Sequence, residues 1–384
     1  MKFKRFGFAL VFATAAAGSM PAWCDDYQFS FLTKYSGFGE SANAVNASGQ
    51  IAGSALALYL NTGQAVVWTS GSPNPLATGD WTITSSAAAA INASGQTAGS
   101  GMVDGKYVAL KWDGATYTVL NSLGSGPSFA LGLNDAGVAV GQSQLQYGAT
   151  HATLWNGTQA TDLGTLGGTT SVANSINNQG MVVGQSWTAY NVRHAALWTG
   201  DHAVDLGMPG GAAYCSGGTY CESSANDIND SGQIAGYLTL ANGGYHAVVW
   251  HDGTVTDIGQ AGRTGNSTAS AINSHGQVVG YAQFEGSLHA ALWSNGNVID
   301  LNSFLDPIAA QQGWVLMTAS DINDNGLVVG TAFNQNNGKA AAYLLSPVLA
   351  PVPEPSSYTL LAAGLVAVGA ASRRRAERRK RQDH

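Results

Sequence analysis

Hydrophobic and polar positions along the chain follow one pattern that recurs seven times. Each copy reads as an apolar residue, Asn, two residues, Gly, three residues and a second Gly. An aromatic residue follows the second Gly by 13 to 15 positions; it is Trp in six copies and Tyr343 in the seventh. The seven asparagines, spaced by about 46 residues, are Asn46, Asn92, Asn134, Asn177, Asn229, Asn273 and Asn323.

The pattern within one copy predicts four short strands. The first strand ends at the apolar–Asn pair, and Asn-x-x-Gly is typical of a tight turn into the second. The third strand ends at the repeat Trp, as in His194–Trp198, and a Gly-containing turn such as Asn156-Gly157 leads into the fourth. Four antiparallel strands in each unit of this length are typical of a β-propeller blade. We therefore predict an all-β, seven-bladed β-propeller over residues 25–350.

The two ends of the repeat region complement each other. The seventh copy lacks a fourth strand, while an unassigned strand, Gln28–Thr33, precedes the first copy. Its continuation, Leu32–Gly37, aligns with Leu163–Gly168 after the fourth strand of the third copy. The N-terminal strand is therefore expected to complete the last blade, which removes the open sheet edges. An open β-solenoid, the alternative architecture, would not need this strand.

The repeat units resemble the HAF repeats of extracellular bacterial proteins. The resemblance covers residues 28–345 and rests on His-Ala before the repeat Trp, with Thr, Ala or Val where that family has Phe. It implies export and a repeated architecture, and it implies no particular chemistry.

Composition and charge narrow the classes of partner. The chain has 50 Gly and only 10% charged residues, which fits short strands and many turns rather than disorder or long helices. Residues 25–352 hold six Lys or Arg against 20 Asp or Glu, a net charge of −14. Nucleic acids and anionic membrane surfaces are therefore excluded as partners of the body, because both require clustered cations.

The first 24 residues predict a secretory signal peptide. A basic start (Lys2, Lys4, Arg5) precedes an apolar run, and small residues come before Asp25-Asp26. The cleavage point lies near Ala22 or Cys24. The segment implies passage through the general secretion machinery.

The last residues, 351–384, have a second distinctive order. Val352-Pro353-Glu354-Pro355 precedes a short apolar stretch, Tyr358–Ala371, and an Arg-rich end follows. This order resembles the PEP-CTERM sorting tail. The resemblance implies a Gram-negative bacterium that makes exopolysaccharide, and processing by an exosortase, a membrane-embedded cysteine transpeptidase that removes the tail. It also implies transient anchoring in the inner membrane by Tyr358–Ala371, then release to the cell surface or a biofilm matrix.

Four copies carry a His four residues before the repeat Trp and an Asp 11 residues after that His. Copies that lack this His also lack the Asp. A two-residue turn at Asn156-Gly157 would place His151 directly opposite Asp162, whereas the turn at Asp252-Gly253 would leave that pair diagonal. No nucleophile recurs nearby and the four pairs diverge, so we expect structural hydrogen bonds rather than catalysis or metal binding. The pairs are His151–Asp162, His194–Asp205, His246–Asp257 and His289–Asp300.

Two further patterns suggest chemistry. Cys215 and Cys221 lie in the longest spacing between copies, and an exported chain meets an oxidising compartment, so we expect a disulfide there. Asp321–Gly326 and Asp227–Gly232 resemble the opening of a calcium loop but lack its final acid. We expect turns, and we expect neither a metal nor another cofactor.

The loops after second strands and between blades should share one face of the ring. Aromatic side chains there could stack on sugar rings, although they could equally cover small local cores. Candidates for this ligand face are Trp81, Trp187, Tyr190, Arg193, Tyr214, Tyr220, Arg263 and Trp314.

Three functions remain open. We expect a non-enzymatic surface or matrix protein that binds exopolysaccharide, another glycan or a matrix protein. A secreted carbohydrate-active hydrolase or lyase is the first alternative, since fold alone does not decide function. Loop acids Asp104, Glu222 and Glu285 could supply its carboxylates. A purely architectural matrix role is the second alternative.

Overall fold

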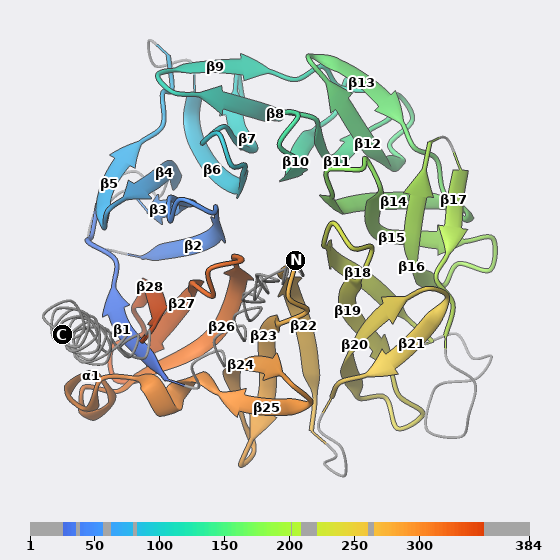
Figure 1. Cartoon of the computed structure of the whole chain (residues 1–384). Coiled ribbons are helices and arrows are strands. Elements are labelled where there is room, and N and C mark those ends of the chain that lie inside the picture. Colours follow the sequence, from blue (N-terminus) through green and yellow to red (C-terminus); the bar gives the residue numbers. More distant parts are fainter. Residues whose placement is uncertain are drawn as a thin grey trace, which may run out of the picture. The chain divides into compact units, whose positions relative to one another are not determined.

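The protein folds as a ring of seven sheets. The structure, a computed structural model, describes residues 26–35, 39–56, 63–79, 83–200, 202–208, 221–259 and 265–348. Within these residues each of the seven sheets has four antiparallel strands and forms one blade (Figure 1). The predicted seven-bladed β-propeller is confirmed. The predicted signal peptide and sorting tail lie outside the described residues.

The first three blades follow the chain order of their strands. Blade 1 comprises β2 (Glu40–Val45), β3 (Ile51–Leu56), β4 (Gly63–Thr69) and β5 (Ser72–Pro75). Blade 2 comprises β6 (Ile83–Ile91), β7 (Thr97–Val103), β8 (Lys106–Asp113) and β9 (Thr116–Val119). Blade 3 comprises β10 (Ser128–Leu133), β11 (Ala139–Gln144), β12 (Thr150–Asn156) and β13 (Gln159–Asp162).

The next three blades have the same order. Blade 4 comprises β14 (Gly167–Ile176), β15 (Val182–Thr188), β16 (Arg193–Thr199) and β17 (His202–Asp205). Blade 5 comprises β18 (Ser223–Ile228), β19 (Ile234–Thr239), β20 (Tyr245–His251) and β21 (Thr254–Asp257). Blade 6 comprises β22 (Ser267–Ile272), β23 (Val278–Phe284), β24 (Ser287–Ser294) and β25 (Asn297–Asp300).

Blade 7 joins the two ends of the ring. It comprises β26 (Trp314–Ile322), β27 (Val328–Asn334), β28 (Ala340–Pro347) and β1 (Tyr27–Phe31). Strand β1 pairs antiparallel with β28, with Phe29 opposite Leu345. The N-terminal strand therefore completes the last blade, as the sequence predicts.

A short helical segment between blades 6 and 7 was not predicted. It consists of η1 (Leu301–Phe304) and α1 (Pro307–Gln311). The Asp300 and Asp306 side chains cap their first turns, and Pro307 stands where a helix tolerates proline. These extra residues account for the wider spacing between the sixth and seventh copies.

The hydrophobic core is divided into seven clusters, each between two neighbouring blades. The repeat aromatic residues are central to them; Trp68, Trp112, Trp155, Trp198 and Tyr343 are at most 1% exposed. A blade thus buries both of its faces against its neighbours, and its stability depends on those contacts.

The second repeat glycine is required by a close backbone contact. The innermost strand of every blade has a β-bulge; in β14 it falls between Ala173 and Ser175. The bulge brings the Val172 carbonyl close to Gly184, where a Cβ atom would lie only 2.0 Å from that oxygen. The same contact, at 1.9 to 2.0 Å, recurs in all seven copies. Any side chain at this position would force the two strands apart.

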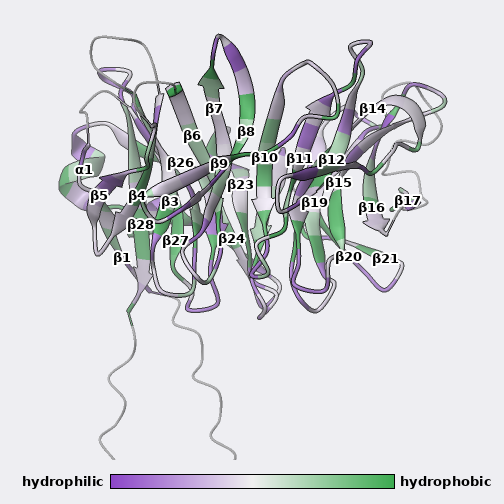
Figure 2. Cartoon of the chain, turned by 90° about the horizontal axis from the view of Figure 1, so that it is seen from above, coloured by the Kyte–Doolittle hydropathy of each residue, from purple (hydrophilic) through white to green (hydrophobic). Residues whose placement is uncertain are grey.

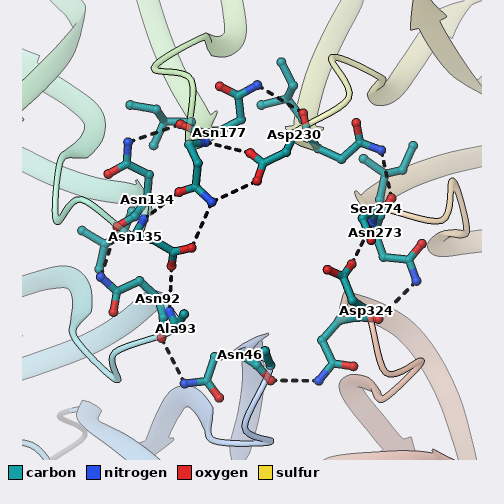
Figure 3. A pocket seen from close by; sticks show the side chains of 18 of the residues that line it. Asn46, Asn92, Ala93, Asn134, Asp135, Asn177, Asp230, Asn273, Ser274 and Asp324 are labelled. Carbon is teal, nitrogen blue, oxygen red and sulfur yellow. Dashed lines mark hydrogen bonds between the residues drawn. The ribbon is translucent and has the colours of Figure 1, made fainter.

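The repeat asparagines form a closed ring of hydrogen bonds around the axis (Figure 3). Each amide nitrogen donates to the backbone carbonyl of the Asn in the next blade, at 2.8 to 3.2 Å, and the Asn323 amide returns to the Asn46 carbonyl. Each amide oxygen accepts the backbone N–H four residues later, which fixes its own turn. One side chain therefore sets both the turn and the contact between blades.

We expect Asn177→Ala to lower the free energy of unfolding by about 2 to 4 kcal/mol, because it removes a buried hydrogen bond to the Asn229 carbonyl and leaves the Met181 N–H without its acceptor. Chemical denaturation followed by tryptophan fluorescence measures the change. Gln179→Ala is the control, since Gln179 lies exposed in the same turn. Equal stability of the two variants would contradict the role of the Asn ring.

Candidate binding site on the loop face

The two faces of the propeller carry different connections (Figure 2). The Asn-x-x-Gly turns and the short outer hairpins lie on one face, which we call the turn face. The connections after second strands and those between blades lie on the opposite face, the loop face, because the strands of each blade are antiparallel. Each face has a cavity of its own.

The turn-face cavity has a volume of about 250 Å³ and is lined by the Asn ring and the residues that follow it. Three of these are acids, Asp135, Asp230 and Asp324. Each carboxylate accepts a backbone N–H of the preceding blade at 2.8 Å (Figure 3). These carboxylates therefore hold neighbouring turns together. Among the described residues, no group of three or more His, Cys, Asp or Glu is placed to hold a metal ion.

Two more acids, Asp227 and Asp321, lie on the innermost strands. Asp321 accepts the Val45 N–H at 2.7 Å and Asp227 accepts the Ile272 N–H at 2.9 Å, each from the next blade. Part of each residue remains accessible, although protein surrounds the carboxyl groups. Burial raises the pKa of both, and for Asp321, where the charge of Asp227 adds to the effect, the pKa reaches about 7. The sequence resemblance to a calcium loop thus corresponds to contacts between blades.

The loop-face pocket is larger, about 590 Å³, and takes residues from three successive blades. Blade 4 contributes the first residue of β16, and blade 5 contributes the residue just before β18 with parts of β19 and β20. Blade 6 contributes β22 and β23. The lining residues are Arg193, Glu222, Tyr237, Thr239, Gly243, Tyr245, Thr268 and Tyr281.

Arg193 contacts several of the side chains in and around this pocket. Its guanidinium pairs with the Glu222 carboxylate and donates to the Tyr237 hydroxyl at 2.8 Å. It lies 5.9 Å from the ring of Trp187, its direct cross-strand neighbour, and 6.0 Å from the ring of Tyr237. Such contacts hold a guanidinium in place through its charge and its flat shape.

Three tyrosines, Tyr237, Tyr245 and Tyr281, also line the pocket. The Tyr237 and Tyr245 rings lie 5.9 Å apart, and Tyr245 is hydrogen-bonded to Tyr281. Burial raises the pKa of Tyr237 and Tyr245, so their hydroxyls stay protonated at neutral pH. Within the part of the chain that the structure describes, the buried Arg193 Nε and Thr268 Oγ1 have no hydrogen-bond partner. Unpaired buried polar atoms are rare and destabilising.

The predicted ligand face is only partly brought together. Arg193 lines the pocket and contacts Trp187, and Tyr190, 89% exposed, lies in the turn between them. Trp314 instead packs against Phe31 in blade 7, with ring centroids 4.9 Å apart. Four candidates lie outside the described residues: Trp81, Tyr214, Tyr220 and Arg263.

Sequence reasoning missed Tyr237, Tyr281 and Thr268 because they lie on strands rather than in loops. A signal was present, however. The residue after the second repeat Gly is Ser, Gln or Thr in five copies, but it is Tyr in the adjacent fifth and sixth copies, at Tyr237 and Tyr281. Two large side chains at one repeat position in neighbouring blades mark a local departure from the scaffold. The loop acids Asp104 and Glu285 lie in hairpin turns of blades 2 and 6.

All four His–Asp pairs are in hydrogen-bond contact, with His Nδ1 2.6 to 2.9 Å from the nearest carboxylate oxygen. The direct opposition expected for His151 and Asp162 is wrong, however, because Asp162 lies opposite Thr153 and His151 contacts it diagonally. The diagonal contact expected for His246 and Asp257 is confirmed. It is the common register and not an exception, because both hairpins have the same two-residue loop.

The Asp of each pair also fixes the connection between blades. Its carboxylate accepts the backbone N–H two residues later, as in Asp205 to Gly207 at 2.8 Å. In blades 1 to 3 the repeat Trp donates to the connection before it, as Trp155 does to the Asn121 carbonyl at 2.7 Å. Blades 4, 5 and 6 each follow a blade that carries a His–Asp pair. Their repeat residues, Trp198, Trp250 and Trp293, have indole nitrogens without a hydrogen-bond partner among the described residues. In these connections the hydrogen bond from the backbone N–H to the Asp carboxylate therefore replaces the hydrogen bond that the Trp indole makes elsewhere.

The expected disulfide involves Cys221, which is disulfide-bonded and 5% exposed. Cys215 lies outside the described residues, so the pairing of these two cysteines stays a prediction. Cys221 directly precedes Glu222 of the loop-face pocket.

The C-terminal tail matches a known family profile. Residues 351–375 are a PEP-CTERM protein-sorting motif. The motif contains Pro353-Glu354-Pro355 and marks an exported protein that is processed by an exosortase. The structure, which leaves residues 349–384 undescribed, contains no helix long and apolar enough to cross a membrane among the residues it does describe.

Several solved structures are similar to this chain at low sequence identity. A puromycin-hydrolysing peptidase of Mycobacterium tuberculosis is 12% identical, with a TM-score of 0.51 over 86% of this chain and 57% of that one. The acylaminoacyl peptidase of Pyrococcus horikoshii is 12% identical, with a TM-score of 0.48 over 80% and 51%. The BP39L lectin of Burkholderia pseudomallei is 11% identical, with a TM-score of 0.42 over 85% and 99%. The chain spans little more than half of either peptidase, and the likeness concerns the fold alone. No curated protein matches in sequence.

We expect Asp321→Asn to change how stability depends on pH. A carboxyl whose pKa rises from 3.8 to about 7 on folding destabilises the folded state progressively as pH increases through that interval. The amide keeps an acceptor for the Val45 N–H and removes the charge. The difference in melting temperature between the variant and the wild type should therefore be more in favour of the variant at about pH 8 than at about pH 4. Identical pH profiles for the two proteins would contradict this assignment.

Proposed function

We propose that the protein is an exported cell-surface or matrix protein whose propeller binds a glycan in the loop-face pocket. One observation carries the proposal. A cation, a carboxylate and several aromatic rings from blades 4, 5 and 6 converge on one cavity of about 590 Å³.

The side chains of the pocket suit the chemistry of a sugar ring. A pyranose has hydroxyl groups at its edge, which pair with planar charged groups such as those of Arg193 and Glu222. Its C–H groups form an apolar face that packs on aromatic rings such as those of Tyr237 and Tyr281. A pocket that combines aromatic side chains with a few fixed polar groups is typical of a small-molecule site.

The charge of the protein favours an uncharged glycan. The body carries a net charge of −14, and Glu222 already neutralises Arg193 in the pocket. A polyanionic polysaccharide would be repelled on approach. We therefore infer that the ligand is a neutral oligosaccharide or a neutral segment of the exopolysaccharide.

Binding without catalysis fits this pocket better than hydrolysis does. Most glycoside hydrolases use two carboxyl groups on either side of the scissile bond. Among the described residues that line the pocket, Glu222 is the one carboxylate, and it is held by Arg193. A purely architectural protein, the remaining alternative, would bind no glycan at all.

We expect Arg193→Ala to weaken binding to an array of neutral gluco-, manno-, galacto- and fuco-oligosaccharides by about tenfold or more, the scale of a central interface residue. Lys106→Ala is the matched control, because it removes a cation from a loop-face hairpin in blade 2. Binding that survives Arg193→Ala would exclude this pocket. Release of shorter sugars during the assay would establish a hydrolase or lyase, and an array without any signal would favour the architectural role.

Sorting is tested separately. Replacing Pro353-Glu354-Pro355 with three Ala should leave the tail attached, because the exosortase would no longer recognise its site. An immunoblot of the producing cells should then show a longer, membrane-associated product, whereas the wild type reaches the surface or the medium. Normal processing of the variant would contradict recognition through this motif.

A further inference from the structure

One of the four His–Asp pairs differs from the others in what it contacts. His194 follows Arg193 on β16, and its ring donates a hydrogen bond to the backbone of Cys221 as well as binding Asp205 through Nδ1 at 2.6 Å. In blade 5 the corresponding His246 leaves Nε2 buried and without a partner among the described residues. The additional contact is therefore not a property of the repeat.

The contacts of β16 with blade 5 form a double clamp. Two consecutive residues of blade 4, Arg193 and His194, bind two consecutive residues at the start of blade 5. Arg193 pairs with the Glu222 side chain, and His194 binds the Cys221 backbone. Because Glu222 lines the proposed site, the Cys221 contact fixes the backbone from which that carboxylate projects.

The protonation state of His194 decides whether the clamp is complete. A neutral imidazole has one N–H donor and one lone pair, whereas the imidazolium has two donors. The ring faces two acceptors, the Asp205 carboxylate and the Cys221 carbonyl, so only the imidazolium satisfies both. After deprotonation the remaining proton stays toward the charged acceptor, Asp205, because charge-assisted bonds are the stronger ones. The lone pair then faces the Cys221 carbonyl.

We propose that His194 is a positioning residue of the loop-face pocket, which holds the segment carrying Glu222 while the imidazole is protonated and releases it at higher pH. This inference rests on the proposed function, since it concerns the same pocket. It gives the site a ligand affinity that is higher in mildly acidic than in alkaline surroundings.

The charged groups around His194 support this direction. The hydrogen bond to Asp205 raises the pKa of His194 above 6.5, although burial opposes it. Burial would raise the pKa of Asp205, but the bonds from His194 and the Gly207 N–H outweigh it and lower that pKa below 3.8. Strand β15 places the uncharged Ser186 opposite His194. Among the described residues of the clamp, the charged Arg193 and Glu222 pair with each other.

The sign of the pH effect follows from these shifts. Folding gives the protonated His194 ring two hydrogen-bond acceptors. Its contribution to the stability of the clamp is therefore complete below pH 6.5 and is lost as pH rises through the higher pKa of the folded state. The Asp205 contribution is lost only as pH falls through its lowered pKa. The clamp is therefore complete between these two limits, in mildly acidic solution.

The test compares three proteins: the wild type, His194→Gln and His151→Gln. The last removes the equivalent pair in blade 3, which contributes nothing to the lining of the pocket. On the array of neutral oligosaccharides, the wild-type dissociation constant should rise by roughly three- to tenfold from about pH 6 to about pH 8.5, the scale of one hydrogen bond. The rise should persist in His151→Gln and disappear in His194→Gln. Wild-type affinity that does not change with pH, or a rise that persists in His194→Gln, would overturn the proposal.

A second readout needs no ligand. Amide hydrogen exchange of the segment 221–228, corrected for the intrinsic dependence on pH, should show less protection at about pH 8.5 than at about pH 6 in the wild type. His194→Gln should show the lower protection at both values. Equal protection at both values in the wild type would also overturn the proposal.

The two proposals fail in different ways. Binding that is lost in Arg193→Ala but independent of pH would remove the role of His194 and leave the pocket in place. Binding unaffected by Arg193→Ala would remove the pocket as the site, whatever the exchange data show for the clamp.

Discussion

A ring of seven buried amides holds the propeller together at its axis. Each repeat Asn shapes its own turn through Oδ1 and binds the next blade through Nδ2, and the last amide returns to the first blade. The geometry is strict, because the same side chain must satisfy both contacts at once. It explains why all seven copies keep this Asn, just as the close approach of the bulged inner strand explains why they all keep the second repeat glycine. With the scaffold fixed at these positions, the outer strands and loops are free to differ.

The candidate site lies where residues of three neighbouring blades depart from the repeat pattern. Tyr237 and Tyr281 occupy one repeat position in adjacent blades, and Arg193 reaches them from blade 4. The contacts that orient Arg193 come from its cross-strand neighbour Trp187 and from Glu222 at the start of the next blade. The pocket thus depends on the packing of blades against each other, and contacts within the protein hold its charged groups in place.

The sequence predicted the architecture better than the site. The spacing of Asn, Gly and Trp predicted the number of blades, their strand order and the closure by β1. These residues could be read from the sequence because each makes its contacts within one copy or with the neighbouring copy. The His–Asp register was missed by two residues, since a hairpin loop of two residues can be placed at either of two positions around Gly157. Pocket residues such as Thr268 could not be found, because their proximity to Arg193 arises only once separate blades are assembled. Trp314 was a candidate for the ligand face for the same reason. It packs against Phe31 of β1, a contact that exists only once the ring is closed.

The closure of blade 7 also has a mechanical consequence. Strand β28 is the last strand before the sorting motif, and it lies between β27 and β1 rather than at a free edge. A pulling force applied to the chain beyond Pro347 would therefore act along a strand that is hydrogen-bonded on both sides, with Tyr27 paired to Pro347 at its very end. Such a load shears two ladders at once instead of peeling one bond after another. A domain tethered at this end would resist drag from moving fluid by the same pairing that closes its ring.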